Sequence, residues 1–154
     1  MPMKILFVCL GNICRSPLAE GILKKKLIER GIEGTVHSAG FEPYHEGQHP
    51  DPRSIATALK HDIDISSKVA RLFSVKDFDR YDKILVMDAM NHADVMRLAR
   101  NDDDRRKVDF LLNLVEEGAN LEVPDPYYGG DGGFDKVYRM MEAACERIAD
   151  ELQS

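Results

Sequence analysis

The chain has 154 residues, is 44 % hydrophobic and carries a formal net charge of −6. This length and apolar content suit one continuous core, so we expect a single domain over residues 1–154. The acidic balance lacks the basic stripe that nucleic-acid backbones require, and no apolar run approaches the roughly 20 residues of a membrane span, which argues against nucleic-acid and membrane partners.

The first predicted element is a strand at residues 4–9, an apolar run too short for a helix and typical of a strand buried on both faces of a parallel sheet. A helix is predicted to follow, with Ser16 as its N-cap, Pro17 at its first position and Gly31 after its last turn. Residues 35–38 then predict a second short strand.

The middle and end of the chain continue this alternation. Asp51 and Pro52 fit the cap and first position of a helix that runs to about Lys60. Ser74 and Asp77 have the spacing of a capping box, which predicts one short helical turn. The remaining predicted elements are a strand at 83–87, a helix at 89–100, a strand at 108–112 and an amphipathic helix at 134–152.

Alternating strands and helices predict right-handed crossovers and an α/β fold, with a doubly wound four-stranded parallel sheet and helices on both faces. The charged run 101–106 is interpreted as a solvated loop. In such sheets ligands bind beyond the carboxyl ends of the strands, where the strand order reverses, and the first strand is commonly at that point. Cys9 ends the first predicted strand, so we expect it at the ligand site.

The segment after Cys9 has the composition of a phosphate-binding loop. It runs into a predicted helix N-terminus, where backbone N–H groups and the positive end of the helix dipole can converge on one anion. Gly11 and Asn12 tolerate the positive φ that a tightly curled loop needs. The expected phosphate-binding residues are Leu10, Gly11, Asn12, Ile13, Cys14, Arg15 and Ser16.

Three side chains of this segment predict nucleophilic chemistry. Arg15 supplies a planar fork that matches two phosphate oxygens. A thiol beside an arginine at a helix N-terminus favours its thiolate form, which makes Cys9 the candidate nucleophile. The hydroxyl of Ser16 can donate to this thiolate or, later, to the leaving sulfur. A cysteine, five residues, then arginine and serine at a strand-to-helix turn therefore predict a phosphate cradle with a nucleophile at its base.

A cysteine that attacks phosphorus needs a carboxylic acid to protonate the leaving oxygen, which is worth roughly 10²–10⁴ in rate. Asp125 is the candidate, because a proline on each side restricts its backbone and holds the carboxylate on a stiff loop. The adjacent Tyr127 and Tyr128 could wall an aromatic slot. Asp88, at the exit of a predicted strand, is the competing candidate, although it also fits the cap of the helix that follows.

Four segments occur in an order that resembles the low-molecular-weight protein tyrosine phosphatase family. They are VCLGNICRSP near the N-terminus, SAGFEPYHEGQHPDPR, ILVMDAMN and VPDPYYGG near the end. The resemblance covers essentially the whole chain, and its first and last motifs are highly specific. It implies a doubly wound four-stranded sheet and a metal-independent protein tyrosine phosphatase without a cofactor, whose partners are phosphotyrosine-containing proteins. Inorganic phosphate and other oxyanions are expected as inhibitors.

The resemblance also implies residue roles. It implies a cysteinyl-phosphate intermediate on Cys9, a phosphate clamp at Arg15, and Asp125 as general acid and then base. The resemblance further assigns loop support to Asn12, Ser16 and Ser38, and a substrate slot to Tyr44, Tyr127 and Tyr128. One departure is Lys68, which stands where many members carry a histidine, so the network around Asn12 and Ser38 is expected to be completed differently.

The three cysteines, an odd number, argue against a disulfide framework, and the N-terminus lacks the charged-then-apolar pattern of a secretory signal. We therefore expect a cytoplasmic protein with free thiols. Cys14 lies on the same loop as Cys9, and the resemblance implies that the two form a reversible protective disulfide. Cys145 is interpreted as core.

Three other functions compete with phosphotyrosine hydrolysis. A phosphoarginine phosphatase of the same family is expected to carry a small residue where this chain has Ile13, and a branched apolar residue fits an aromatic phosphate better. A thiol-dependent arsenate reductase needs further cysteines around residues 80–90, and that stretch has none. A phosphotyrosine-binding module without catalysis would not need Cys9, Arg15 and Asp125 together. The scattered histidines predict no metal site.

Overall fold

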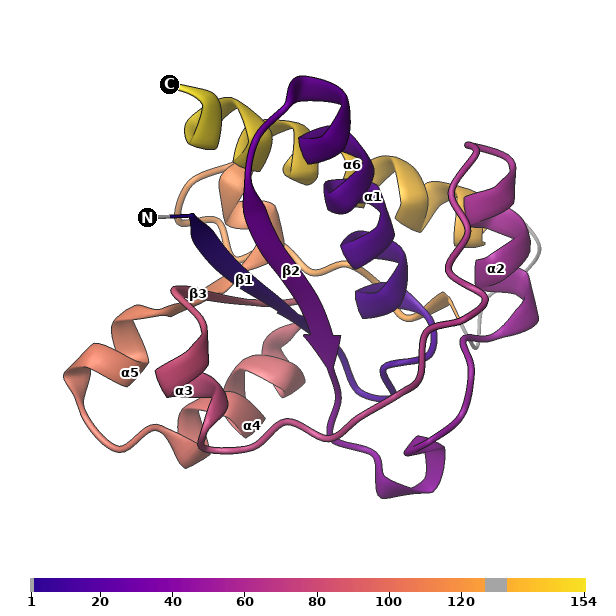
Figure 1. Ribbon diagram of the computed structural model, residues 1–154. Helices are drawn as coiled ribbons and strands as arrows, with labels where there is room; N and C mark the ends of the chain where they lie inside the picture. The colour runs from indigo at the N-terminus through magenta and orange to yellow at the C-terminus, as the bar shows by residue number, and fades with distance from the viewer. Residues whose placement is uncertain (1, 127–132) are drawn as a thin grey trace.

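The apolar runs of the sequence pair as parallel strands at the centre of the molecule. The computed structural model describes residues 2–126 and 133–154 (Figure 1). Its sheet has the order β2-β1-β3-β4, and every pair of neighbours is parallel. The strands are β1 (Met3–Val8), β2 (Gly34–Ala39), β3 (Lys83–Val86) and β4 (Val108–Phe110). The predicted α/β fold with a four-stranded parallel sheet is therefore confirmed.

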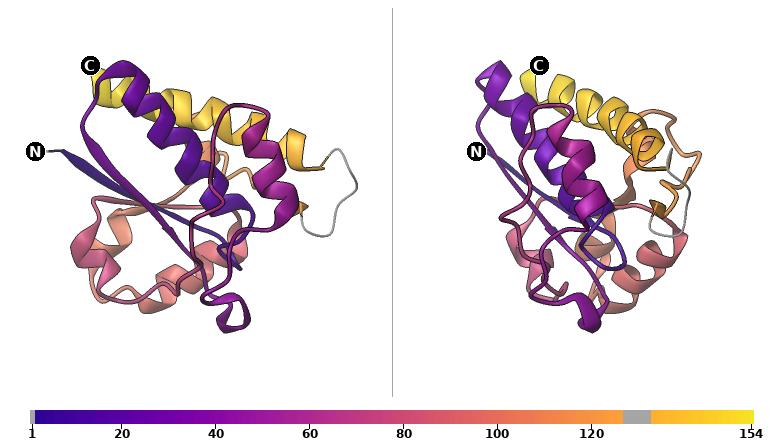
Figure 2. Two further views of the ribbon diagram at one scale, coloured as in Figure 1. Left: turned by 45° about the vertical axis from the view of Figure 1, so that its right-hand side comes forward. Right: turned by 90° about the vertical axis from the view of Figure 1, so that its right-hand side faces the viewer.

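Helices cover both faces of this sheet, as the two further views in Figure 2 show. One face carries α1 (Arg15–Arg30), α2 (Pro52–Leu59) and α6 (Gly133–Gln153). The opposite face carries α3 (Asp77–Arg80), α4 (Ala89–Leu98) and α5 (Asp102–Arg106). Two short 3₁₀ helices, η1 (Pro43–His45) and η2 (Leu111–Leu114), lie in connections. Among the described residues, no helix combines the length and apolarity that crossing a membrane requires.

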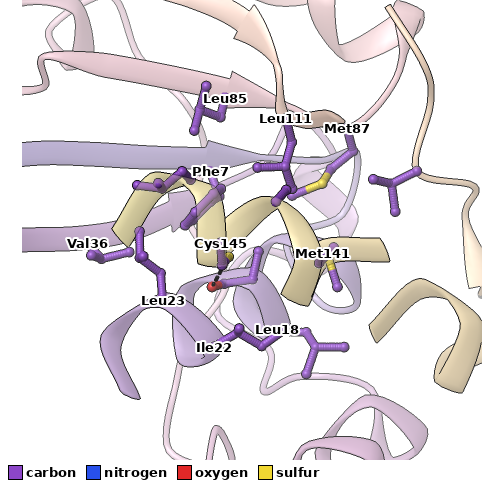
Figure 3. Close-up of a cluster of buried hydrophobic side chains, with 14 of the residues drawn as sticks. Phe7, Leu18, Ile22, Leu23, Val36, Leu85, Met87, Leu111, Met141 and Cys145 are labelled. Carbon is purple, nitrogen blue, oxygen red and sulfur yellow. Dashed lines mark hydrogen bonds between the residues drawn. The ribbon is translucent and has the colours of Figure 1, made fainter. Parts of the chain in front are cut away.

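The core follows from the alternation of side chains along β1. Ile5 and Phe7 join the larger cluster beneath α1 and α6, whereas Leu6 and Val8 join the cluster on the other face. Figure 3 shows the larger cluster, in which Phe7 lies near Leu23 of α1 and Cys145 of α6. Cys145 is fully buried there, as predicted. A strand buried on both faces needs an apolar residue at every position, which is why its sequence is nearly continuous in apolarity.

Two of the predicted helix N-caps are confirmed and one is wrong. The carboxylates of Asp51 and Asp88 cap α2 and α4 by accepting the N–H groups of Arg53 and Asn91, each at 2.8 Å. The prediction that Ser16 is the N-cap of the first helix is wrong, because α1 already begins at Arg15. The hydroxyl of Ser16 is instead engaged in hydrogen bonds within the loop that precedes the helix, described below.

Two further boundaries differ from the prediction. The last strand ends at Phe110, and the chain continues as the 3₁₀ helix η2 rather than as strand to 112. The charged run 101–106 is not a loop: residues Asp102–Arg106 form α5, whose N-cap Asn101 accepts the N–H of Asp104 at 2.8 Å. The aspartates in its first turn and the arginines in its last turn both suit the helix dipole, which explains why a short, exposed charged segment is helical.

The strand order places the reversal of the sheet beside β1. The chain goes from β1 to β2 on one side and later returns to β3 on the other, so β1 has a neighbour on each side. In sheets of this kind, ligand-binding crevices form outside the carboxyl ends of the strands at this point. Residues 9–14 occupy it and lead directly into α1.

Candidate active site

The loop of residues 9–14 is curled so that several of its amides face inward. Three of its carbonyl groups are bound from outside, and in a planar trans peptide the following N–H points the opposite way. The N–H groups of Gly11, Cys14 and Arg15 therefore point into the loop. The carbonyl oxygen of Leu10 accepts the N–H groups of Phe41 and Glu42 at 2.7 and 3.0 Å. The carbonyl oxygen of Ile13 accepts the N–H of Asp51 at 2.8 Å, and that of Cys14 accepts the hydroxyl of Ser54 at 3.0 Å.

Asn12 holds the loop closed from within. Its backbone has φ of 55°, a left-handed conformation that asparagine tolerates better than most residues. Its side-chain amide donates to the hydroxyls of Ser16 and Ser38 at 2.8 and 2.9 Å, and its amide oxygen accepts the N–H of Arg71 at 3.0 Å. Asn12, Ser16 and Ser38, which the resemblance assigned to loop support, thus lie in one network.

Gly40 lies directly beneath this loop and leaves no room for a side chain. A Cβ at this position would lie 2.8 Å from the carbonyl oxygen of Leu10 and 2.9 Å from the backbone nitrogen of Asn12. Both are backbone atoms, which cannot rotate away. No sequence signal marks Gly40 as part of the site, because a glycine after a strand does not reveal what packs against it.

We predict that Gly40→Ala distorts the loop. The substitution is expected to destabilise the fold by about 1–3 kcal/mol, as overpacking does, and to lower kcat about tenfold. Urea unfolding and steady-state kinetics measure the two effects. Gly34→Ala, at the first residue of the strand that precedes Gly40, is the control, because a Cβ there meets the flexible end of Leu27 at 3.1 Å and the carbonyl oxygen of Met3 at 3.4 Å but no atom of the loop. An alanine at position 40 that preserved both stability and kcat would show that the close approach is not a constraint.

The sulfur of Cys9 lies at the base of this loop and is 2 % exposed as a residue. The N–H of Asn12 donates to Cys9 Sγ at 3.2 Å, and the hydroxyl of Ser16 lies 3.0 Å from it. The single hydroxyl proton of Ser16 is free to point at the sulfur, since the oxygen already accepts from the Asn12 amide. Donors directed at sulfur favour its anionic form.

Arg15 is buried at 2 % exposure and is oriented by two fixed acceptors. Its Nη1 donates to Asp88 Oδ2 at 2.7 Å and to the carbonyl of Val123 at 2.9 Å. Its Nη2 lies 3.7 Å from Asp125 Oδ2. Burial tends to lower the pKa of Arg15, but Cys9 and the two carboxylates raise it above its usual value, so the guanidinium stays charged.

Two carboxylates were candidates for the acid, and the structure places them differently. Asp88 is committed to structure, because Oδ1 caps α4 and Oδ2 binds Arg15. Asp125 lines the pocket above the loop and is 29 % exposed. Its segment is attached to the end of β3, where the N–H of Val123 donates to the carbonyl of Met87 at 2.7 Å. The geometry therefore favours Asp125 over Asp88 as the group that can reach a substrate.

A cavity of about 440 Å³ opens over the loop. Its lining includes Cys9, Arg15 and Asp125, which the structure thus brings to one pocket. Tyr44 lies at its rim and is 77 % exposed, so its ring is available to a ligand. His45 also lines the pocket, and a Cβ on Gly11 would lie 3.1 Å from its ring. Tyr127 and Tyr128, the other predicted walls of the slot, lie outside the described residues.

Cys14, the predicted redox partner of Cys9, lines the same pocket and is buried at 5 % exposure. All three cysteines are free thiols. Burial raises the pKa of Cys14 well above its usual range. The nearby carboxylate of Asp51 and the sulfur of Cys9 add smaller effects in the same direction. Its reversible disulfide with Cys9 stays a prediction.

Four residues that the sequence did not assign to the site support it. They are Glu20, Gly40, Asp88 as the acceptor of Arg15, and Arg71. Lys68, whose effect the sequence left open, contacts Glu20 Oε2 at 2.7 Å. Within residues 2–126 and 133–154, no group of three or more His, Cys, Asp or Glu residues could hold a metal ion.

Comparison with known proteins places this geometry in context. A family model described as "Low molecular weight phosphotyrosine protein phosphatase" matches residues 4–154. A low molecular weight protein-tyrosine-phosphatase of Streptomyces coelicolor is 38 % identical over 148 residues, which are 94 % of this chain and 90 % of that protein.

Two solved structures are similarly close. A protein tyrosine phosphatase from Entamoeba histolytica superposes with a TM-score of 0.90 at 35 % identity and covers 98 % of this chain and 97 % of its own. A Drosophila arginine phosphatase has a TM-score of 0.90 at 31 % identity and covers 99 % of both chains.

Proposed function

The chain belongs to the low molecular weight phosphotyrosine protein phosphatase family, and we propose that Cys9, Arg15 and Asp125 carry its hydrolysis of phosphotyrosine. Members of this family are hydrolases that act on phosphoproteins. One observation supports the assignment of roles above all: the Cys9 sulfur lies at the base of a loop of inward N–H groups, in one pocket with a buried guanidinium and a reachable carboxylate.

In the first step the Cys9 thiolate attacks phosphorus in line with the phenolic oxygen of the substrate. The amides of residues 10–15 and Arg15 bind the three equatorial phosphate oxygens and stabilise the charge they carry in a loose transition state. The S–P bond forms as the P–O bond breaks, and Asp125 gives its proton to the departing phenolate, whose conjugate acid has a pKa of about 10.

In the second step water attacks the phosphorus of the cysteinyl phosphate. Asp125, now ionised, removes a proton from this water, the S–P bond breaks, and inorganic phosphate leaves. Ser16 donates to the departing sulfur, since its proton faces Cys9. Inorganic phosphate is the product and fits the loop, so we expect it to inhibit the phosphatase reaction. Other oxyanions are expected to inhibit in the same way.

Rates with phosphopeptides test the substrate class. We expect kcat/KM for a phosphotyrosine peptide to exceed that for the matched phosphoarginine and phosphoserine peptides, because Tyr44 and the loop wall suit an aromatic ring. Preference for phosphoarginine would favour the second candidate, which the similarity to an arginine phosphatase keeps open. The three free thiols suit a reducing compartment, so we also propose a cytoplasmic site of action.

Ile13 is expected to contribute to this preference. Its side chain lines the pocket and packs with Cys14, Ala70 and Phe134. We predict that Ile13→Ser lowers kcat/KM for phosphotyrosine about tenfold, because apolar contact with the ring is lost, and lowers that for phosphoarginine less. The ratio of the two kcat/KM values is the measurement, and Ile13→Val is the control that keeps the branched apolar shape. An unchanged ratio would exclude Ile13 from substrate selection.

A further inference from the structure

One wall of the catalytic pocket carries a carboxylate that the proposed reaction does not use. Glu42 is half-buried and lines the cavity over the loop together with Tyr44 and His45. Its Oε1 accepts the N–H of Tyr44 at 3.5 Å, so the carboxylate lies next to Tyr44 at the rim of the pocket. A negative charge at this place opposes the phosphate dianion that the pocket is proposed to receive.

The segment that carries Glu42 is tied to the phosphate loop at both ends. At its start, the N–H groups of Phe41 and Glu42 both donate to the carbonyl of Leu10. At its end, the N–H of Asp51 donates to the carbonyl of Ile13. A wall held in this way keeps its charge at a fixed place relative to a bound phosphate, so it can discriminate between substrates.

No cation of the described chain neutralises this carboxylate. Glu42 forms no ion pair within residues 2–126 and 133–154. Among the described residues that line the pocket, Arg15 is the only lysine or arginine, and its Nη2 lies 3.7 Å from Asp125 Oδ2. His45, on the same wall as Glu42, contacts Gln48 Oε1 at 2.9 Å through Nδ1. The cation that would offset the charge of Glu42 must therefore come from the substrate.

The position of the carboxylate at the rim indicates which part of a substrate supplies that cation. When a phosphotyrosine side chain fills the pocket, the residues before and after it in the peptide have to cross the rim. A lysine or arginine there pairs with Glu42 and offsets the repulsion between this carboxylate and the phosphate. An aspartate or glutamate there adds to the repulsion.

We propose that Glu42 selects phosphotyrosine flanked by lysine or arginine, because its carboxylate pairs with the cationic side chain that crosses the rim of the pocket. The inference rests on the phosphotyrosine hydrolysis proposed above and adds the chemical class of the flanking sequence. Glu42 takes no part in the making or breaking of bonds, so its contribution is distinct from those of Cys9, Arg15 and Asp125.

The test compares phosphotyrosine peptides that differ only in the residues on either side of the phosphotyrosine, which are lysine, alanine or glutamate. The measured quantity is the ratio of kcat/KM for the lysine peptide to kcat/KM for the glutamate peptide. We expect this ratio to fall by about tenfold in Glu42→Gln, because the variant loses one attraction and one repulsion. The glutamine oxygen can still accept the N–H of Tyr44, so the wall retains its shape.

Glu46→Gln is the matched control. Glu46 belongs to the same segment and is exposed, but it does not line the pocket. The control thus removes the same formal charge a few residues further along the chain, and its ratio is expected to stay within about twofold of that of the unmodified chain. Glu42→Lys is the opposite case, in which we expect the glutamate peptide to become the better substrate. Thermal unfolding of each variant reports stability separately.

Salt separates charge pairing from a change in the shape of the pocket. Raising the concentration of NaCl from about 0.02 to 0.5 M screens charges at the rim, so the ratio of the unmodified chain is expected to decrease severalfold. The ratio of Glu42→Gln is expected to decrease less, because its main rim charge is already absent. An equal decrease in both proteins would overturn the inference.

The outcomes also distinguish this inference from the proposed function. Equal ratios for the unmodified chain and Glu42→Gln would overturn the inference, as would an equal fall in Glu46→Gln. If the unmodified chain hydrolysed none of the peptides, the proposed function would be contradicted instead. Calorimetric titration of Cys9→Ser with the same peptides measures the preference without turnover, and affinities that did not depend on the flanking residues would overturn the inference by themselves.

Discussion

Replacement of Cys9 by serine is expected to lower the turnover of p-nitrophenyl phosphate by about 10⁴-fold or more. The substitution nearly retains the size of the side chain but replaces the sulfur, which the N–H of Asn12 and the hydroxyl of Ser16 contact at 3.2 and 3.0 Å, with a hydroxyl, which is a much weaker nucleophile. No covalent intermediate can then form at a useful rate. Steady-state release of p-nitrophenol at pH 6 measures the loss.

Binding should survive this change, because the inward amides and Arg15 are untouched. Calorimetric titration with inorganic phosphate is expected to give an affinity within about tenfold of that of the unmodified chain. Cys145→Ala serves as the control, since this cysteine is buried in the core beside Ala19 and lies outside the pocket. Full turnover by the Cys9→Ser protein would refute the nucleophile assignment.

Replacement of Asp125 by alanine is expected to lower kcat for phenyl phosphates by about 10²–10⁴-fold, and the loss should grow as the leaving phenol becomes more basic. A strongly basic phenolate needs a proton in the transition state, whereas a weakly basic one leaves without help. The measurement is kcat for a series of substituted phenyl phosphates, plotted against the pKa of each phenol, for the unmodified chain and the variant.

Asp88→Ala is the informative comparison. Asp88 binds Arg15 at 2.7 Å and caps α4, so its loss should weaken phosphate binding and lower the rate by a similar factor for every leaving group. If the leaving-group dependence appeared in the Asp88 variant and not in the Asp125 variant, the acid would be Asp88. Equal rates for the Asp125 variant and the unmodified chain would exclude Asp125 as the general acid.

The sequence determined the features that depend on neighbours along the chain. Four apolar runs alternating with helical patterns predicted the parallel sheet, because periodicity and β-branched content act within a few residues. The loop from Cys9 to Ser16 is contiguous, so its spacing alone predicted a phosphate cradle. The caps at Asp51 and Asp88 were also predictable, since a cap and the N–H that it accepts are two or three residues apart.

The prediction misjudged two local elements. Ser16 is a residue type that often caps helices, but its hydroxyl hydrogen-bonds with Asn12 and Cys9 of the curled loop. The segment 101–106 is charged, which favoured a loop, yet Asn101 caps α5 and Arg100 pairs with Asp104 at 2.8 Å, four residues away. The curled loop decided the first case, whereas the second rests on local contacts that the interpretation as a loop overlooked.

Only the tertiary structure decided how the parts of the site meet. Arg15 and Asp88 are 73 positions apart, and Glu20 and Lys68 are 48 apart, so no sequence signal links them. The parallel register of β1 with β3 brings Asp88 and the segment of Asp125 to the loop, and the hydrogen bond from the N–H of Arg71 to Asn12 ties residues 68–71 to the loop, where Lys68 reaches Glu20. Local sequence thus specified a cradle and a candidate acid, whereas strand register and packing determined which charges face them.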